Sequence, residues 1–480
     1  TDHPKLFLCH SRRSQQQQCQ QGQTEQPYFR FHLYFHHHYP LESCCYFYYY
    51  TRETYLLYIV FLVIMIALLW INKTLRQSFF TVSNYLIITF SVITGVQVIA
   101  CLWLKYETAT MEYWMILTVF IVIALLTDLV ASRFAKKVSF NGIKLKSSCE
   151  STFMSKHEKR FNIICVFAAM YSVTHFIYLA GGFPKMYYVV QEQFQNQYSA
   201  GLNFYIRLFM MIATAYYLGC AKISKKNILL GLLCLIPNIL TFVKGIVFIP
   251  CLASILLRLK NGDIKISLKA GITIVFVGIM VFFGVYLVEM SVYDPDILLK
   301  IDTYQFIGSK LIDYLIAGVQ SFSQNISTHN VYSFKHLDNV TLAPFINFMA
   351  KFGFGESIDT VNTVWQTFGF SSIRDISITS NVNTYVGTLY LYNGMIIGNL
   401  LNILWVFITS FMDEVFSKRN DILTALSALF CAAFSLGWFE YYFVHTFWVY
   451  LIAIAILVSV ILKMRITPQK QNRTGRYFNG

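Results

Sequence analysis

The chain has 480 residues, of which 56% are hydrophobic and only 13% are charged, and its formal net charge is +14. This composition lies outside the range of soluble globular proteins, so it predicts a core built within a membrane. In a soluble domain the positive charge would suggest nucleic acid as a partner. In a membrane protein it marks topology instead, and no nucleic-acid partner is expected.

Residues 1–52 differ in character from the rest of the chain. They contain four consecutive glutamines at 15–18, three histidines at 36–38 and a tyrosine-rich stretch that ends at Tyr50, without the apolar core or cleavage site of a signal peptide. The histidines can bind metal in principle, but we interpret the segment as a disordered or non-native leader. We also expect a first membrane helix upstream of the visible ones to have been lost.

Apolar stretches recur along the chain from Tyr55 onward, and their lengths suit a hydrocarbon layer about 30 Å thick. They predict an all-α, polytopic integral membrane protein with about eleven transmembrane helices. We divide it into spans one to eight at 53–290, a large extracytoplasmic loop at 291–384, spans nine to eleven at 385–464 and a basic tail at 465–480. The expected spans are 55–71, 79–104, 112–132, 161–180, 204–221, 227–243, 245–257, 268–290, 385–411, 422–438 and 443–463.

Positive charge alternates between successive loops, which orients the chain. The loops after the first, third, fifth, seventh and ninth of these spans, and the C-terminal tail, are rich in Lys and Arg, beginning with Lys73 and Arg76. This side, and with it the C-terminus, is predicted to be cytoplasmic. The opposite side carries 105–112, 181–203, the short turn at Lys244, the loop 291–384 and 438–445. Attraction to anionic lipids explains most of the basic clusters.

Cysteine does not predict a disulfide framework or a metal site. The chain has eleven cysteines, but many lie in or beside apolar runs and the loop 291–384 has none. No Cys-x-x-Cys pair and no His-Glu-x-x-His motif is present. We therefore expect no metal and no other cofactor.

The loop 291–384 mixes aromatic residues with amides and hydroxyls, a composition that suits sugar binding because rings stack on sugars and polar groups bond their hydroxyls. Helical spacing at 309–322 and 342–352 predicts short interfacial helices that cap an outward-facing cavity. An aromatic belt at the membrane interface is an equally good interpretation for any single residue. The polar candidates are Gln320, Asn325, His329, Asn330, Asn362, Gln366, Asn381 and Asn383.

Three cations at the outer side are placed where charge is costly or scarce. Arg207 lies a few residues inside a span, Lys244 occupies a turn with almost no loop, and Arg374 is followed by Asp375 late in the large loop. Cations in such places can bind a pyrophosphate group and stabilise its charge as it leaves. Snorkelling, or a local pair of Arg374 with Asp375, remains the alternative.

Residues 379–398 resemble a pattern of bacterial O-antigen and capsule repeat-unit polymerases of the Wzy type. There a long external loop ends in Asn-x-x-Thr-aromatic and enters a tyrosine-rich helix with Gly-x-x-x-Gly; the matching residues here are Asn381, Thr384, Tyr385, Gly394 and Gly398. The glycines suit close helix packing. Segments 240–245 and 314–322 are also similar to that family, which often has arginine in place of Lys244 and an acidic residue in place of Tyr392.

The resemblance implies a GT-C-like fold in the bacterial cytoplasmic (inner) membrane and glycosyl transfer at its outer face. Undecaprenyl-pyrophosphate-linked oligosaccharides would be joined into a surface polysaccharide, with membrane lipids, a flippase and a chain-length regulator as partners. Arg207, Lys244 and Arg374 would bind the pyrophosphate, and Asp375, Glu356, His329 or His336 would supply a base. Gln320, Asn381, Asn383, Thr384 and Tyr385 would contact the substrate. Because the acidic residues of the external loop are scattered, metal-independent catalysis is expected.

Other functions remain open. A ligase of related architecture would move the finished glycan to another acceptor, and the sequence separates it poorly from a polymerase. A flippase or other transporter would show internal repeats and polar residues at mid-depth, and no clear repeat is visible. A scaffolding protein would not need Arg207 and Lys244 at these depths.

Overall fold

A computed structural model describes most of the chain. The described residues are 41–104, 106, 108–140, 151–181, 192–265, 267–291, 296, 300–328, 340, 342–358, 366–371, 376–380, 382–416 and 421–463. The chain divides into two units, Thr1–Tyr50 and Thr51–Gly480. In the first unit the described part is the beginning of α2; all contacts below lie in the second unit.

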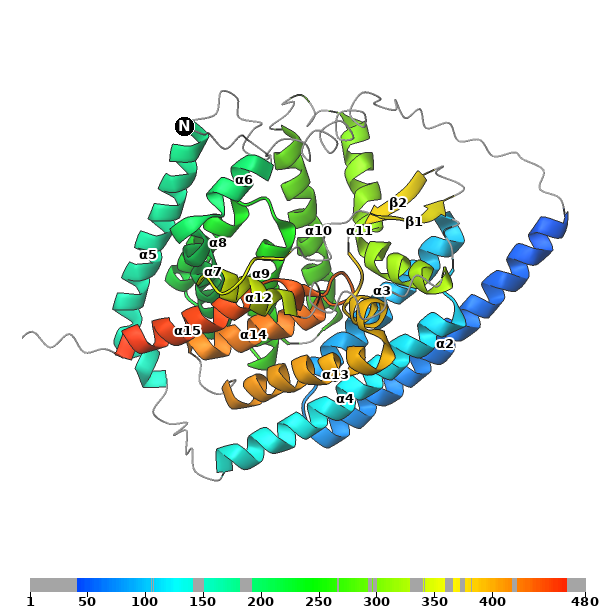
Figure 1. Ribbon diagram of the computed structural model, residues 1–480, viewed down its shortest axis with the longest axis horizontal. Helices are drawn as coiled ribbons and strands as arrows, with labels where there is room; N and C mark the ends of the chain where they lie inside the picture. Colours follow the sequence, from blue (N-terminus) through cyan, green and yellow to red (C-terminus); the bar gives the residue numbers. More distant parts are fainter. Residues whose placement is uncertain are drawn as a thin grey trace, which may run out of the picture. The chain divides into compact units, whose positions relative to one another are not determined.

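In the described residues of the second unit, the regular structure is helical apart from one small antiparallel sheet. Helices α2 (Leu41–Arg76) and α3 (Val82–Leu104) precede α4 (Met111–Phe140) in the chain, and α13 (Tyr385–Phe416) lies along α4 (Figure 1). The remaining elements are α5 (Ser151–Gly181), α6 (Glu192–Tyr198), α7 (Gly201–Ala215) with a π-helical turn (Tyr216–Cys220), α8 (Lys225–Ile239), α9 (Lys244–Lys260), α10 (Leu268–Ser291), α11 (Ile301–Ser327), α12 (Ala343–Ala350), β1 (Gln366–Ser371), β2 (Ile376–Ser380), α14 (Ile422–Ser435), a 3-10 turn (Tyr442–Val444) and α15 (Phe447–Lys463).

Among the described residues, six helices are long and apolar enough to cross a membrane: Tyr55–Arg76, Val82–Trp103, Met111–Val138, His157–Gly181, Gly271–Val288 and Tyr385–Phe416. The segments Ile422–Ser435 and Phe447–Leu462 are apolar but shorter. These helices confirm the class of helical membrane protein, whereas the expected eleven spans stay a prediction. In the region of the fifth to seventh expected spans, α7 ends in a π-helical turn, and α8 and α9 each contain a proline, Pro237 and Pro250.

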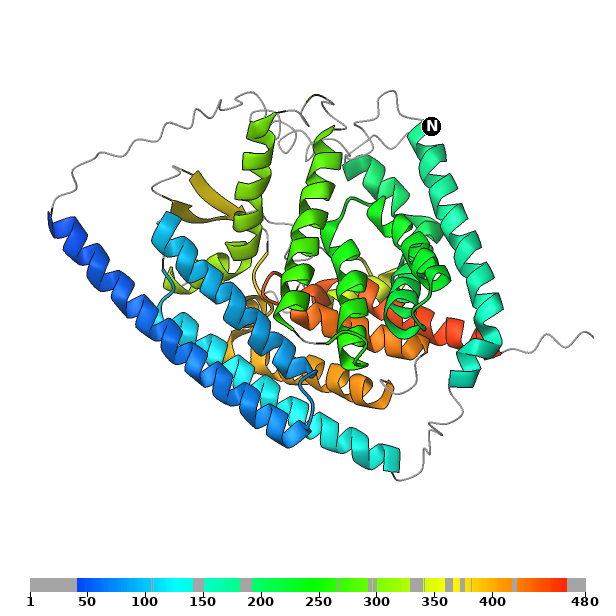
Figure 2. The ribbon, with the colours of Figure 1, turned by 180° about the vertical axis from the view of Figure 1, so that it is seen from behind.

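The predicted loop contains more structure than short interfacial helices. The helix expected at 309–322 is the long helix α11, and many side chains of its C-terminal half are buried against the core. Helices α10 and α11 stand side by side in both views (Figures 1 and 2). The strands β1 and β2, which the sequence analysis did not predict, pair with each other in the same region. The short helix expected near 342–352 is present as α12.

Gly394 interrupts the helical backbone of α13, a feature that the sequence analysis did not predict. Gly394 has φ 68° and ψ −175°, and no atom would contact a Cβ added to it within 4 Å. A Cβ on Gly398 would lie 2.7 Å from the Leu389 carbonyl oxygen, so Gly398 allows the chain to pack on itself. Residues 395–416 after the break span about 33 Å, which matches the hydrocarbon layer.

We expect Gly394→Ala to lower the free energy of unfolding by about 1–2 kcal/mol, because an alanine at positive φ brings its Cβ close to the following carbonyl oxygen. Gly284→Ala is the matched control, since a Cβ there also meets no atom within 4 Å and its φ is not positive. The control should leave stability unchanged or raise it by about 0.5–1 kcal/mol. Denaturant unfolding in detergent measures both; equal effects would contradict a strained turn at Gly394.

The helix ends that the charge pattern assigns to one side meet each other in the structure. Arg76 pairs with Asp128 and Glu414, and Lys260 pairs with Asp413. At the opposite end, the Tyr385 amide donates to the Gly437 carbonyl oxygen over 2.5 Å, and Gln97 donates to Gln320 over 3.0 Å. We call these the basic end and the opposite end of the helices.

Candidate functional site

Lys244 lies inside a box of aromatic rings at the opposite end. It is the first residue of α9, and its Nζ is 3.6 Å from the ring centroid of Tyr286, 5.1 Å from that of Tyr314 and 6.0 Å from that of Phe282. Tyr286 and Phe282 belong to α10, whereas Tyr314 belongs to α11. The negative faces of aromatic rings attract an ammonium group. Three helices therefore hold this half-buried cation in place.

The segment 436–446, between α14 and α15, packs against this box. The Phe439 ring stacks on Tyr314 with centroids 5.9 Å apart, and Tyr442 lies against Gly245, where a Cβ would come 3.3 Å from its ring and hydroxyl. Gly318 allows α11 to approach this segment closely, because a Cβ at Gly318 would lie only 2.6 Å from the Phe439 carbonyl oxygen. We call the box and this segment the Lys244 cluster.

A carboxylate and an imidazole belong to the same cluster. Glu440 Oε1 and His445 Nε2 are 2.8 Å apart, and their side chains are 12% and 33% exposed. Burial, followed by the negative charge of Glu440, raises the pKa of Tyr442 well above its usual value. The Tyr442 hydroxyl therefore keeps its proton at neutral pH. The cluster thus combines a cation, a carboxylate, an imidazole and a neutral phenol.

Arg207 is a second, more deeply buried cation near the same end. Arg207 is 4% exposed. One of its guanidinium nitrogens donates to Ser199 Oγ, and the guanidinium lies 5.8 Å from the ring centroid of Tyr198. Among the residues that the structure describes, its Nε has no hydrogen-bond partner. Within the described part of the chain, no carboxylate forms an ion pair with Arg207. An uncompensated buried cation of this kind is costly unless an anion joins it.

The two cations flank one short turn between α8 and α9. Asn238 Nδ2 donates to the Arg207 carbonyl oxygen over 3.4 Å, and Thr241 Oγ1 donates to the Asn238 carbonyl oxygen over 2.7 Å. The amide of Val243, the residue before Lys244, donates to Thr241 Oγ1 over 3.2 Å. A continuous run of hydrogen bonds therefore connects the backbone of α7 at Arg207 with the start of α9.

Several of the predicted substrate-contacting groups are used within the protein. Gln320 is 1% exposed and accepts from Gln97, and the Asn383 side chain accepts from Ser321 Oγ. Asn325 donates to the Ser321 carbonyl oxygen over 3.0 Å. The bonds of Gln320 and Asn383 fasten α11 to α3 and to the start of α13, whereas the Asn325 bond lies within α11. A contact of Gln320 or Asn383 with a sugar stays a prediction.

The matched residues Thr384 and Tyr385 have clear structural roles. Thr384 Oγ1 accepts from the Gly387 amide over 2.8 Å, as a helix cap does. The Tyr385 hydroxyl donates to Asn402 Oδ1 over 3.1 Å, and Asn402 in turn donates to the Phe120 carbonyl oxygen on α4. Both residues are buried, so they position the beginning of α13.

The other predicted site residues are separate from these groups or cannot be placed. Glu356 is exposed in the segment after α12. The structure brings Arg207 and Lys244 to one turn, but it does not bring Glu356 into contact with either. The residues Arg374, Asp375, His329, His336, Asn330, Asn362 and Asn381 lie outside the described residues.

Sequence reasoning missed Glu440, His445 and Tyr286. Segment 438–445 was interpreted only through its lack of Lys and Arg, although an acidic residue and a histidine so close together in a short outer turn were a usable signal. Tyr286 was counted only as part of an apolar span. Within the described ranges, no group of three or more His, Cys, Asp or Glu residues is arranged to hold a metal ion.

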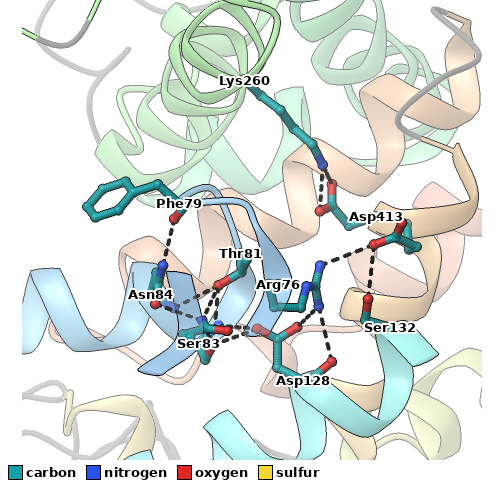
Figure 3. A network of polar contacts seen from close by, with 11 residues as sticks. Arg76, Phe79, Thr81, Ser83, Asn84, Asp128, Ser132, Lys260 and Asp413 are labelled. Atoms are coloured by element: carbon teal, nitrogen blue, oxygen red, sulfur yellow. Dashed lines mark hydrogen bonds and ion pairs between the residues drawn. The ribbon is translucent and has the colours of Figure 1, made fainter. Parts of the chain in front are cut away.

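The sequence analysis also missed an ionic network at the basic end of the helices (Figure 3). Arg76 lies between Asp128 and Glu414, with nitrogen to oxygen distances of 2.7 and 3.2 Å. Lys260 binds both oxygens of Asp413 at 2.6 Å. The sequence analysis assigned Arg76 and Lys260 to topology alone. The signal was the set of carboxylates inside otherwise apolar helices, where a charge needs a partner.

No curated protein and no solved structure matches this chain. A profile of a family of unknown function, DUF6337, matches residues 104–468. The match begins at the end of α3 and includes α4 to α15, so the Lys244 cluster and Arg207 both fall inside it. The chain belongs to this family of unknown function, DUF6337.

Proposed function

We propose that the chain polymerises undecaprenyl-pyrophosphate-linked oligosaccharide repeat units by metal-independent glycosyl transfer at the outer face of a bacterial cytoplasmic membrane. The observation that carries this proposal is Arg207, a buried guanidinium without an ionic partner among the described residues, beside the turn that leads to Lys244. The apolar helices and the resemblance to repeat-unit polymerases at 379–398 support it.

The two cations differ in a way that suits a pyrophosphate. A guanidinium offers a planar fork of donors that matches phosphate oxygens, whereas an ammonium acts as a compact point charge. Arg207 Nε is a buried donor without a partner among the described residues, and the Lys244 ammonium lies over the Tyr286 ring. A pyrophosphate close to both would offset the cost of keeping Arg207 buried.

In the proposed reaction, an acceptor hydroxyl oxygen attacks the anomeric carbon of the donor sugar. The bond between that carbon and the pyrophosphate oxygen breaks, and its electron pair leaves with the lipid pyrophosphate. Fixed cations stabilise the negative charge that develops on the leaving oxygen. A flippase would supply the lipid-linked units from the cytoplasmic side, and a chain-length regulator would act on the product.

We expect Lys244→Met to abolish the polysaccharide ladder in a polymerase-deleted host that carries the matching repeat-unit pathway, because the leaving group loses a fixed cation. Lys244→Arg should retain part of it, since the charge remains. Lys351→Met is the matched control: this lysine is exposed after α12 and should have no effect. Gel resolution of the surface glycan, with membrane insertion checked for each variant, measures the result.

The outcome for the unaltered chain separates the function classes. A ladder supports polymerisation. A single repeat unit already transferred to its final acceptor, with no ladder, would contradict polymerisation and favour a ligase or transporter.

One observation favours a transporter as the second candidate. Helix α13 is interrupted at Gly394, and discontinuous helices are common where transporters bind substrate. A flippase would move the lipid-linked unit across the membrane without joining units. Reconstitution in vesicles with a labelled lipid-linked unit distinguishes the two: translocation without any longer product would support the flippase.

A further inference from the structure

The Glu440 and His445 pair leaves one imidazole nitrogen available. Glu440 Oε1 lies 2.8 Å from His445 Nε2. An ionised carboxylate can only accept, so Nε2 carries the hydrogen and Nδ1 keeps its lone pair. Within the part of the chain that the structure describes, the imidazole makes no second hydrogen bond, and one third of the His445 side chain is exposed. This is the tautomer that a proton acceptor needs.

The pair lies one aromatic ring away from the start of α9. The Tyr442 and His445 ring centroids are 6.4 Å apart, and Tyr442 also lies against Gly245, next to Lys244. The His445 ring stacks on Phe447 with an interplanar angle of 15°, which fixes its plane. The imidazole is thus held in a defined orientation, and it contacts a ring that also lies against Gly245, the neighbour of the lysine to which the proposed function assigns the pyrophosphate.

We propose that His445 is the general base of the glycosyl transfer and that Glu440 positions it; this inference rests on the proposed function. His445 Nδ1 takes the proton of the acceptor hydroxyl as its oxygen bonds to the anomeric carbon, and the electron pair of the broken bond departs with the lipid pyrophosphate. Glu440 stabilises the imidazolium that forms. The imidazolium then returns its proton to water before the next turnover.

Other carboxylates at this end fit the role less well. Glu112 is exposed and approaches the Tyr390 hydroxyl only at 3.5 Å. Glu356 is exposed in the segment after α12. Asp313 is as buried as Glu440, but it accepts from the Tyr106 hydroxyl over 3.3 Å and lies 3.8 Å from the Lys310 ammonium. Glu440 instead touches an imidazole, the side chain that most often serves as a general base.

The test uses the full chain in lipid nanodiscs with the lipid-linked repeat unit that supports the ladder in the deleted host. His445→Gln should lower kcat by about 100-fold or more, the range for a lost general base. Its affinity for undecaprenyl pyrophosphate should change less than about threefold, because the cations remain. His157→Gln, which alters a histidine near the beginning of α5, is the control and should keep the kcat of the unaltered chain.

Two further variants separate catalysis from folding. Imidazole in the buffer should restore part of the rate of His445→Ala, measured per folded protein after size exclusion. Glu440→Gln should lower kcat with little change in KM. Glu440→Asp should show a smaller loss, because it keeps the carboxylate that positions His445, whereas Gln keeps only the size of the side chain.

Each outcome decides the matter. If the unaltered chain polymerises while His445→Gln keeps its kcat, or if imidazole fails to raise the rate of folded His445→Ala, His445 is not the base and the polymerase proposal stands. If the unaltered chain makes no polymer, the proposed function falls and the assignment of His445 falls with it.

Discussion

Asp128→Ala should lower the free energy of unfolding by about 3–5 kcal/mol, since removal of one partner leaves a buried charge uncompensated. The Asp128 side chain is fully buried; it accepts from Arg76 over 2.7 Å and from Ser83 Oγ over 2.5 Å. The Ser83 amide also donates to it over 3.3 Å, so Asp128 fastens the beginning of α3 to α4. Denaturant unfolding in detergent, followed by tryptophan fluorescence, measures the loss.

A surface pair on another helix provides the control. Lys226 and Glu158 are also close, at 2.8 Å, but their side chains are 62% and 39% exposed. Glu158→Ala should therefore cost less than about 1 kcal/mol. The double variant Arg76→Met with Asp128→Leu should recover part of the loss, because both charges leave together. A loss as small for Asp128→Ala as for Glu158→Ala would show that the network does not hold these helices together.

The sequence predicted where helices end better than which helices contact one another. The start of α9 at Lys244 and the side assigned to Arg76 both follow from apolar length and loop charge, which are local properties. The pairing of Arg76 with Glu414 joins residues far apart in the chain, so it depends on how α2 and α13 pack. No local pattern contains that information.

The glycine motif shows the same limit. Gly-x-x-x-Gly at 394–398 is compatible with two packed helices and with a break inside one helix, and only the backbone angle at Gly394 decides between them. Thr384 and Tyr385 were assigned to substrate because of a resemblance. The structure shows that Thr384 bonds to Gly387 and Tyr385 to Asn402, and their contact with substrate stays a prediction.

Only part of the candidate site could be predicted from the sequence, and the reason is physical. Lys244 and Arg207 stand out because charge is rare at their depth, and the structure places them on either side of one turn. Glu440 and His445 lie in a segment where polar residues are ordinary. Their importance arises from the contacts of Phe439 and Tyr442 with other helices, which no spacing in the sequence reveals.

Arg207→Met should leave the free energy of unfolding within about 1 kcal/mol of the unaltered chain, or raise it, because an apolar side chain replaces a buried charge that has no ionic partner among the described residues. The same variant should lose about 100-fold or more in polymerisation rate if the guanidinium stabilises the leaving pyrophosphate. A residue that costs stability and is needed for turnover is the pattern expected of a functional site.

Arg258 is the matched control for that variant. It is also buried, but it donates to the Leu218 carbonyl oxygen over 2.7 Å and to the Ala221 carbonyl oxygen over 2.5 Å, and it pairs with Asp263 at 2.7 Å. Arg258→Met leaves these acceptors without their donor, so it should destabilise the fold by about 3–5 kcal/mol. If Arg207→Met instead destabilised the chain as strongly as Arg258→Met and left the rate per folded molecule unchanged, Arg207 would be a structural residue, and the pyrophosphate site would have to lie elsewhere.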